Sequence, residues 1–226
     1  MVESDKSVSL YGASGHAKVV MDIVEASGLH VCDVFDDNVA NTHFRGIEVK
    51  HVYDGASPMI VSIGDCNIRR RIVERLNCHF LSAIHPTAII SPSVKIGVGT
   101  VVMQGVVIQA DATIGNHCIV NTQSSVGHDC RIGDFVHIAS GATVCGGTEI
   151  GEGTWLGAGS VVKQGIKIGK NCMIGAGSVV VRDIPDGVTA FGNPARVKVI
   201  DDNMYSAGNQ LIVGGGKALV FNSLAA

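Results

Sequence analysis

The sequence has few aromatic residues, little net charge and no long apolar run. Only 4% of its 226 residues are aromatic while 29 are glycine, a balance that suits a narrow β-structure. The formal net charge of −3 gives no indication of nucleic-acid binding. No stretch reaches the roughly 18 apolar residues that a membrane span needs, and the opening MVESDKS is unlike a signal peptide. We therefore expect a soluble, cytoplasmic protein without membrane insertion.

The seven cysteines are odd in number and form no CxxC pair. We therefore expect neither a disulfide framework nor a cysteine zinc site, and no metal. Cys118, Cys130 and Cys172 recur at one position of a six-residue repeat, where cysteine is expected to pack as a small apolar side chain.

That repeat is the most regular feature of the chain. Every sixth residue is aliphatic at Ile84, Ile90, Ile96, Val102, Ile108, Ile114, Val120, Val126, Ile132, Ile138, Val144, Ile150, Leu156, Val162, Ile168, Ile174 and Val180. A period of six fits neither an α-helix nor separate strands, so the segment is a repeat array. It predicts a parallel β-helix in which three hexads make one triangular coil of about 18 residues.

Two further hexad positions are restricted in residue type. Glycine often follows the aliphatic residue and is predicted to relax the backbone at the corners, at Gly97, Gly115, Gly133, Gly151, Gly169 and Gly175. The aliphatic residue is predicted to fill the prism interior. Four positions later, a small or β-branched side chain is predicted to pack beside it near a corner, at Ala88, Thr100, Ala112, Cys118, Ser124, Cys130, Ala142, Ser160, Cys172 and Ser178.

The segment before the array has a different pattern. SVSLYG, VCDVFDD and PMIVSIGD are typical of strands, and ASGHAKVVMDIVEASG and NIRRRIVERL are typical of helices. Strands that alternate with helices predict a small parallel α/β sheet, Rossmann-like but shorter. We therefore predict a Rossmann-like domain over residues 1–83, a β-helix over residues 84–198 and a tail over residues 199–226 without an assigned role.

The loop after the first strand is a candidate phosphate-binding site. It contains Gly12, Ala13, Ser14, Gly15 and His16. Glycine allows a phosphate to approach the backbone closely, and the following helix supplies free N–H donors. The alternative is a tight turn without a ligand. The loop lacks the full GxGxxG pattern, so a mononucleotide diphosphate fits better than a dinucleotide.

Two other strand ends would lie beside this loop. Asp36 and Asp37 end the second strand, where carboxylates accept hydrogen bonds from ribose hydroxyls or a base; the alternative is a solvated turn. Gly64 and Asn67 start the second helix and would add backbone donors. The arginines at 69–71 are expected mostly on a solvated face of that helix, with one possible contact to a phosphate.

The array carries one candidate catalytic pair, His128 and Asp129. His128 lies two residues after Val126, at an outward position. Histidine is suited to act as a base near neutral pH, and an adjacent carboxylate can orient its ring. Gly146 lies one coil further on, so space remains above the ring for an acetyl thioester, with the Gly146 N–H as an oxyanion donor. The alternative is an ordinary exposed histidine.

Three segments carry a family resemblance: the leader YGASGHAKVV, the run SSVGHDCRIGDFVHIASGATVCGG, and the following IGEGTWLGAGSVVKQGIKIGKNCMIGAGSVVVRDIPDGVTAFGNPAR. Together they resemble bacterial hexapeptide-repeat sugar-nucleotide acetyltransferases. These include UDP-4-amino-sugar N-acetyltransferases and sialic acid O-acetyltransferases. The resemblance implies a left-handed β-helix, catalysis by His128 and Asp129, and homotrimers with active sites between protomers. It also implies acetyl-CoA binding by His137, Gly146, Gly157, Ala158, Gly175 and Ala176, with Arg182 among the cations suited to the phosphates of CoA.

The expected function is N-acetylation of a nucleotide-linked 4-amino-4,6-dideoxy sugar by acetyl-CoA, by direct transfer with His128 as general base. The nucleotide sugar would bind to the N-terminal domain. One alternative is O-acetylation of sialic acid, and another is a non-catalytic sensor or scaffold that binds sugar nucleotides. A metallo-hydratase similar to γ-carbonic anhydrases is disfavoured, because His117, His128 and His137 are not separated by whole coils.

Overall fold

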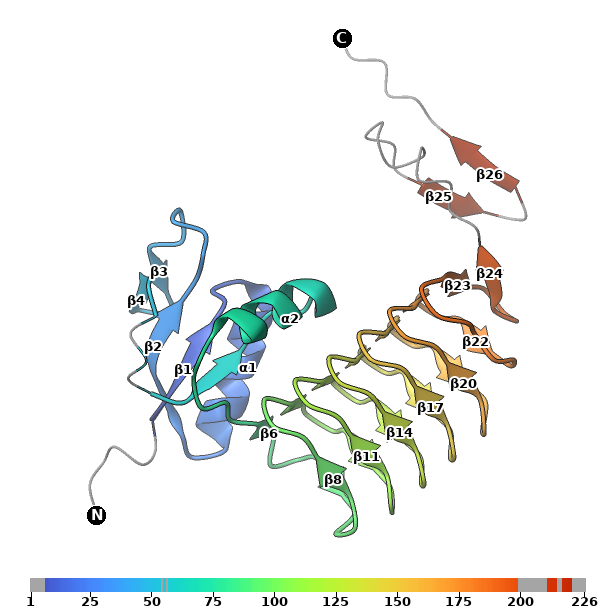
Figure 1. Ribbon diagram of the computed structural model, residues 1–226, viewed down its shortest axis with the longest axis horizontal. Helices are drawn as coiled ribbons and strands as arrows, with labels where there is room; N and C mark the ends of the chain where they lie inside the picture. The colour runs from blue at the N-terminus through green and yellow to red at the C-terminus, as the bar shows by residue number, and fades with distance from the viewer. Residues whose placement is uncertain (1–6, 54, 56, 199–210, 215–216, 221–226) are drawn as a thin grey trace.

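The computed structural model describes residues 7–53, 55, 57–198, 211–214 and 217–220. A small α/β unit lies at one end of a long β-helix, and the coils advance away from it toward the C-terminal end of the array (Figure 1). The predicted fold class, a Rossmann-like parallel sheet followed by a left-handed β-helix, is confirmed. Within the described ranges, no helix has the length and apolarity to cross a bilayer.

The α/β unit is built on a five-stranded sheet in the order β3-β4-β2-β1-β5. Neighbouring strands are parallel except for β3 and β4. The strands are β1 (Ser7–Tyr11), β2 (His30–Phe35), β3 (His43–Phe44), β4 (Ile47–Lys50) and β5 (Met59–Val61). Because β1, β2 and β5 run in the same direction, their carboxyl ends meet at one edge, beside the predicted nucleotide-binding loops.

Helix α1 (Gly15–Ala26) follows β1, and helix α2 (Cys66–Arg75) follows β5. The helical spacing predicted for α1 is confirmed, because its periodic apolar residues are buried: Ala17, Val20, Met21 and Val24. They pack in one cluster with Val101, Met103 and Ile119 of the β-helix. Ile72 of α2 packs in a second cluster with Tyr11 and Phe35. Helix α1 therefore joins the sheet to the β-helix through an apolar layer.

The hairpin β3–β4 was not predicted. Its two-residue turn consists of Arg45 and Gly46, both with positive φ. Arginine seldom occupies a left-handed position, so the sequence carries only the glycine half of the usual hairpin signal.

The β-helix has three faces of parallel two-residue strands, and equivalent residues of successive coils are paired. The first face consists of β6 (Ala83–Ile84), β9 (Val101–Val102), β12 (Ile119–Val120), β15 (His137–Ile138), β18 (Trp155–Leu156) and β21 (Met173–Ile174), extended by β23 (Thr189–Phe191) and β24 (Arg196–Lys198). The second face consists of β7 (Ile89–Ile90), β10 (Val107–Ile108), β13 (Ser125–Val126), β16 (Thr143–Val144), β19 (Val161–Val162) and β22 (Val179–Val180). The third face consists of β8 (Lys95–Ile96), β11 (Thr113–Ile114), β14 (Arg131–Ile132), β17 (Glu149–Ile150) and β20 (Lys167–Ile168).

The interior follows the predicted packing. The aliphatic positions from Val102 to Val180 are buried in one continuous core. The small residues four positions later are also buried at Thr100, Ala112, Cys118, Ser124, Cys130, Ala142, Ser160, Cys172 and Ser178, whereas Ala88 in the first coil is half-buried.

The predicted role of the glycine after each aliphatic residue is wrong. None of the six has a positive φ among the described residues; the left-handed position is three residues after the aliphatic one, at Gly99, Gly105, Asp111, His117, Gln123, Asp129, Phe135, Gly141, Gly147, Gly153, Gly159, Gly165, Asn171 and Gly177. The glycine after the aliphatic residue serves close packing instead. A Cβ on Gly151 would lie 2.5 Å from the backbone N of Lys170 in the next coil.

Beyond the array, a two-stranded antiparallel sheet pairs β25 (Leu211–Gly214) with β26 (Lys217–Val220). Most of the predicted tail over residues 199–226 lies outside the described residues, and its role stays unassigned.

Candidate active site

The side chains of His128 and Asp129 are in direct contact at the corner between the second and third faces. His128 Nδ1 lies 2.7 Å from Asp129 Oδ2. Because a carboxylate only accepts hydrogen bonds, Nδ1 carries the proton and Nε2 keeps its lone pair. Asp129 has a left-handed backbone (φ 60°), a conformation in which aspartate is enriched. The two predicted side chains are thus paired, and the second ring nitrogen of His128 is left for another partner.

Gly146 lies against the free side of the imidazole. A Cβ on Gly146 would sit 2.6 Å from His128 Nε2, so any side chain there would displace the ring. The Gly147 N–H donates to the His128 carbonyl over 2.8 Å and holds the two coils in register. The Gly146 N–H donates to no group among the described residues and is available as an oxyanion donor.

A shallow groove of about 280 Å³ runs beside this pair, lined by Val107, Gln109, Ser125, Val126, Gly127, His128, Thr143, Val144, Cys145 and Gly146. The His128 side chain is 64% exposed. A single chain therefore leaves the reacting position open to water on one side.

The predicted phosphate-binding loop has the backbone that such a loop needs. Gly12 has φ 118°, and a Cβ there would meet Ile63 Cδ1 at 2.6 Å. Ser14 is the N-cap residue of α1, and its hydroxyl accepts no capping hydrogen bond from the described helix. Gly15 and Ser14 are exposed. The N–H groups and hydroxyl at this helix start can therefore reach a bound anion.

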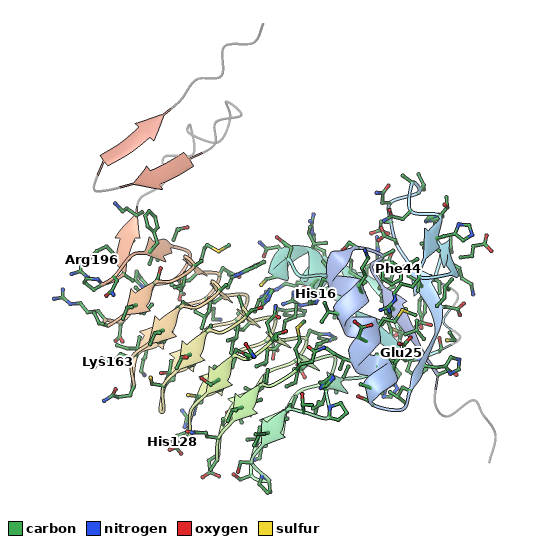
Figure 2. All side chains as sticks on the ribbon, turned by 180° about the vertical axis from the view of Figure 1, so that it is seen from behind. His16, Glu25, Phe44, His128, Lys163 and Arg196 are labelled. Atoms are coloured by element: carbon green, nitrogen blue, oxygen red, sulfur yellow. The ribbon has the colours of Figure 1, made fainter. Side chains whose placement is uncertain are left out.

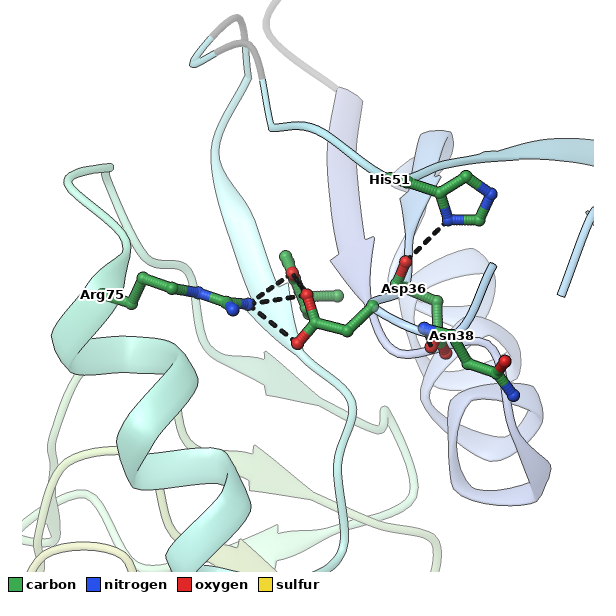
Figure 3. A network of polar contacts seen from close by, with 6 residues as sticks. Asp36, Asn38, His51 and Arg75 are labelled. Atoms are coloured by element: carbon green, nitrogen blue, oxygen red, sulfur yellow. Dashed lines mark hydrogen bonds and ion pairs between the residues drawn. The ribbon is translucent and has the colours of Figure 1, made fainter. Parts of the chain in front are cut away.

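The two aspartates have different surroundings (Figure 3). Asp36 closes the loop, since its Oδ2 accepts from the Ala13 N–H at 2.7 Å. Asp37 accepts from Tyr11 Oη at 2.5 Å and forms an ion pair with Arg75 at 2.9 Å. Burial and then the Asp37 carboxylate raise the pKa of Tyr11 to about 12. Both carboxylates are thus fixed at the carboxyl edge of the sheet, beside the loop.

His137 lies beside the predicted acceptor residues and not beside His128 of the same chain. Its Nδ1 is 3.1 Å from the Gly64 carbonyl and its Nε2 is 3.1 Å from Asn121 Nδ2. Its ring contacts those of His16 and Trp155. Burial, and then the Arg69 charge, lower the pKa of His137 to about 3. The neutral ring therefore donates to Gly64 and accepts from Asn121.

The same junction holds His16, whose pKa is lowered to about 4 by burial and then by Arg69. Its Nε2 is buried without a hydrogen-bond partner among the described residues. Asn67, near the start of α2, is exposed. His16 and Gly64 thus lie between the sheet and the first face of the β-helix, each against the buried His137, and Asn67 is exposed three residues beyond Gly64; this region is termed the acceptor surface.

This surface and His128 lie on different sides of one chain (Figure 2). His137 belongs to β15 on the first face, while His128 follows β13 on the second face. Figure 2 shows His16 of α1 where the N-terminal domain meets the coils, and His128 at the far edge of the coils. The two histidines are nine residues apart, half of an 18-residue coil, so the repeat itself places them on different faces, although the family resemblance assigns both to one active site.

Four other predicted cofactor-binding residues lie along the corner between the first and second faces: Gly157, Ala158, Gly175 and Ala176. Ala158 and Ala176 are exposed and stack one coil apart. A Cβ on Gly157 would lie 2.5 Å from the Ala176 N, and one on Gly175 would lie 2.7 Å from Phe191 Cβ. Arg182 is exposed at the corner that also carries His128. The small residues leave a narrow strip of accessible backbone.

Comparison with known proteins agrees with these features. Residues 7–76 match the PglD N-terminal domain, and residues 111–146 and 147–182 match the bacterial transferase hexapeptide family. The chain is 39% identical over 115 residues to UDP-N-acetylbacillosamine N-acetyltransferase of Bacillus subtilis (strain 168), covering 43% of this chain and 51% of that protein. It spans only a quarter to a half of the length of the curated relatives that it matches.

Solved structures match over nearly their whole length. A histidine-to-asparagine mutant of perosamine N-acetyltransferase from Caulobacter crescentus, in complex with CoA and GDP-perosamine, is 38% identical with a TM-score of 0.82, covering 86% of this chain and 97% of that one. The acetyltransferase domain of PglB from Neisseria gonorrhoeae, in complex with acetyl coenzyme A, is 36% identical with a TM-score of 0.79, covering 85% and 99%. This chain belongs to the family of hexapeptide-repeat sugar-nucleotide acetyltransferases that carry a PglD-type N-terminal domain.

Proposed function

We propose that this protein transfers the acetyl group of acetyl-CoA to the 4-amino group of a nucleotide-linked 4-amino-4,6-dideoxy sugar. The observation that carries the proposal is the His128–Asp129 contact of 2.7 Å with Gly146 against the ring. Two similar proteins named as sugar N-acetyltransferases, one of them solved with CoA and GDP-perosamine, support the type of acceptor, and the PglB acetyltransferase domain solved with acetyl coenzyme A supports the donor.

The transfer would proceed in one displacement. The amine nitrogen of the sugar attacks the thioester carbonyl, a C–N bond forms, and the C–S bond of acetyl-CoA breaks. His128 Nε2 takes the proton from the attacking amine and returns it to the leaving thiolate of CoA. Asp129 holds the tautomer and stabilises the imidazolium, and the Gly146 N–H donates to the carbonyl oxygen as charge develops there.

The acceptor would bind through its nucleotide to the N-terminal domain. Its phosphates would accept hydrogen bonds from the free N–H groups at 14–16 and at the start of α2, while the Gly12 and Ala13 N–H groups hold the loop to Phe35 and Asp36. Asp36 and Asp37 would accept from the ribose or the base. The pantetheine arm would lie along Gly157, Ala158, Gly175 and Ala176, a strip without bulky side chains.

The separation of the two surfaces supports a homotrimer with shared active sites. In a direct transfer, a sugar bound at the acceptor surface would have to reach His128, and within one chain the two lie on different sides. In a cyclic trimer, one corner of each β-helix contacts a different corner of its neighbour, so His128 of one protomer would face the acceptor surface of the next. Such packing would also cover the exposed His128 ring and exclude water.

The test is thiol release from acetyl-CoA with UDP-, dTDP- and GDP-linked 4-amino-dideoxy sugars and with sialic acid and CMP-sialic acid. We expect release with one amino sugar. His128→Ala should lower kcat by about 10²–10⁴, the usual contribution of a general base. Asp129→Asn should also lower it strongly, because an amide donor would place the ring in the wrong tautomer.

The other outcomes separate the alternatives. Release only with sialic acid or CMP-sialic acid would move the assignment to O-acetylation. Binding of a sugar nucleotide without any release would indicate a sensor. Full activity of His128→Ala would show that His128 is not the general base.

A further inference from the structure

Arg69 differs from the two arginines that follow it on α2. It is 1% exposed and is the only buried Lys, Arg, Asp or Glu in the part of the chain that the structure describes. Arg70 is half-buried and Arg71 is exposed. The expectation of a mainly solvated arginine face is therefore wrong at Arg69, which points into the junction between the N-terminal domain and the β-helix.

The guanidinium of Arg69 is bound by backbone carbonyls. Nε donates to the His117 carbonyl and Nη2 to the Phe135 carbonyl, both over 2.8 Å. Nη1 donates to the carbonyls of Ile63 and Gly64, both over 2.9 Å. No carboxylate contacts it among the described residues. A buried ion costs several kcal/mol unless its donors are satisfied, so these four bonds define its position closely.

The two β-helix acceptors are corner residues of adjacent coils. His117 and Phe135 have left-handed backbones with φ of 52° and 59°. The coil-to-coil hydrogen bonds of the described residues use their N–H groups but not their carbonyls. The planar fork of one arginine therefore fills two acceptor positions that the repeat leaves open. A lysine, with a single ammonium group, could not match this geometry.

The two other acceptors belong to the loop that precedes α2. The Gly64 carbonyl also accepts from His137 Nδ1. The adjacent Ser62 hydroxyl donates to the carbonyls of Tyr11 and Gly12, both over 3.0 Å. Arg69 is thus bonded to two β-helix coils and to the loop before α2, and the same loop is bonded through the neighbouring Ser62 to the first loop of the candidate nucleotide site.

We propose that Arg69 is a positioning residue that sets the sugar-nucleotide loops relative to the β-helix. This inference rests on the proposed function, because it concerns the distance between the acceptor amine and the acetyl group. The loops belong to one domain and the acetyl group to the other, so their alignment depends on the junction. A displacement of about 1 Å in such an alignment can lower the rate by about 10².

The test compares Arg69→Met and Arg69→Lys with Arg71→Met, the matched control on the same helix. We expect kcat to fall about 10²-fold for Arg69→Met, with Arg69→Lys close to it, because the fork is lost in both. The KM for acetyl-CoA should stay within about two-fold of the wild-type value. Arg69 makes no direct contact with the residues predicted to bind acetyl-CoA, and it is linked to one of them, His137, only because both side chains donate to the Gly64 carbonyl. Arg71→Met should retain wild-type kinetics. A purely structural role would lower Tm but leave kcat per folded protein unchanged.

Amide hydrogen exchange of the ligand-free trimer provides a readout without turnover. In Arg69→Met, peptides covering residues 62–66 and the corners at His117 and Phe135 should exchange faster than in the wild type, and in Arg71→Met they should not. If no acceptor is turned over by the wild type, the proposed function fails and the exchange result still decides the role of Arg69. Wild-type kcat and unchanged exchange in a folded Arg69 variant would overturn the inference, as would an equal loss in Arg71→Met. Should Arg69→Met not fold, Arg69→Lys carries both measurements.

Discussion

At the scale of single residues, the repeat explains why His128 and Asp129 can form a base. The third residue after each aliphatic position takes a left-handed backbone, and here that residue is Asp129. Aspartate tolerates this conformation better than most residues, so Asp129 can occupy the left-handed corner position and also contact the His128 ring. The short carboxylate reaches the imidazole directly at 2.7 Å.

Gly146 gives the sharpest test of this site. In Gly146→Ala the new Cβ would lie 2.6 Å from His128 Nε2, so the exposed ring must move away from the reacting position. We expect kcat to fall by about 10², the cost of a comparable misplacement, with little change in Tm. The measurement is steady-state kinetics beside a thermal melt.

The neighbouring Gly147→Ala is the matched control. Gly147 has φ 66° and open space around its Cβ position, so alanine there should cost about 1 kcal/mol of backbone strain without touching the ring. Its Tm should fall while kcat per folded protein is kept. The same activity loss in both variants would show that backbone disturbance, rather than contact with His128, is responsible.

At the scale of elements, the period of six predicted the strands of all three faces and the buried positions between them. It predicted neither which corner residue is left-handed nor the burial of Arg69, because both depend on contacts with the next coil or the other domain. The triple arginine at 69–71 is typical of a solvated helix face, and only the docking of α2 on His117 and Phe135 selects one of the three. The residue types of the candidate site could be predicted from the sequence, but the contacts of His137 with Gly64 and His16 of the other domain could not.

The docking of these elements should depend on pH. Burial, and then the Arg69 charge, lower the pKa of His16 and His117 to about 4 and that of His137 to about 3, from 6.5. The unfolded chain therefore binds more protons below pH 6.5, and stability is present above that pH and lost as the pH falls toward 4. By pH 5.5 the loss should be about 1 kcal/mol per histidine, or roughly 10 °C in Tm for all three.

Thermal melts between pH 7.5 and 5.5 measure this loss. His117→Asn removes one of the three groups and keeps a residue suited to the left-handed backbone, so its Tm should fall less steeply with acidification. His43→Asn, at an exposed position on β3, is the control. An identical slope in His117→Asn and the wild type would contradict a role for this buried histidine.

At the scale of the whole molecule, one chain presents two incomplete halves of a site. The first and second faces share the corner with Gly157 and Ala158, and the second and third faces share the corner with His128. In a cyclic oligomer of identical chains, one patch of each chain contacts a different patch of its neighbour. This symmetry would bring the His128 corner of one chain to the acceptor surface of the next. In the proposed trimer, the groove beside His128 would form one wall of the site and the next protomer would form the other.

Mixing two inactive variants tests this arrangement. His128→Ala removes the base, and Gly12→Val should disable the acceptor loop, because Gly12 has φ 118° and no room for a side chain. If each site uses His128 of one protomer and the acceptor loop of the next, every mixed trimer contains one intact site. Equimolar co-expression makes three quarters of random trimers mixed, so activity should return to about a quarter of the wild-type value. Sites confined to one protomer would give no recovery, since each chain would carry a defect in its own site. Light scattering on the mixture establishes that the trimers have formed, and acetyl-CoA binding by each parent variant establishes that both have folded.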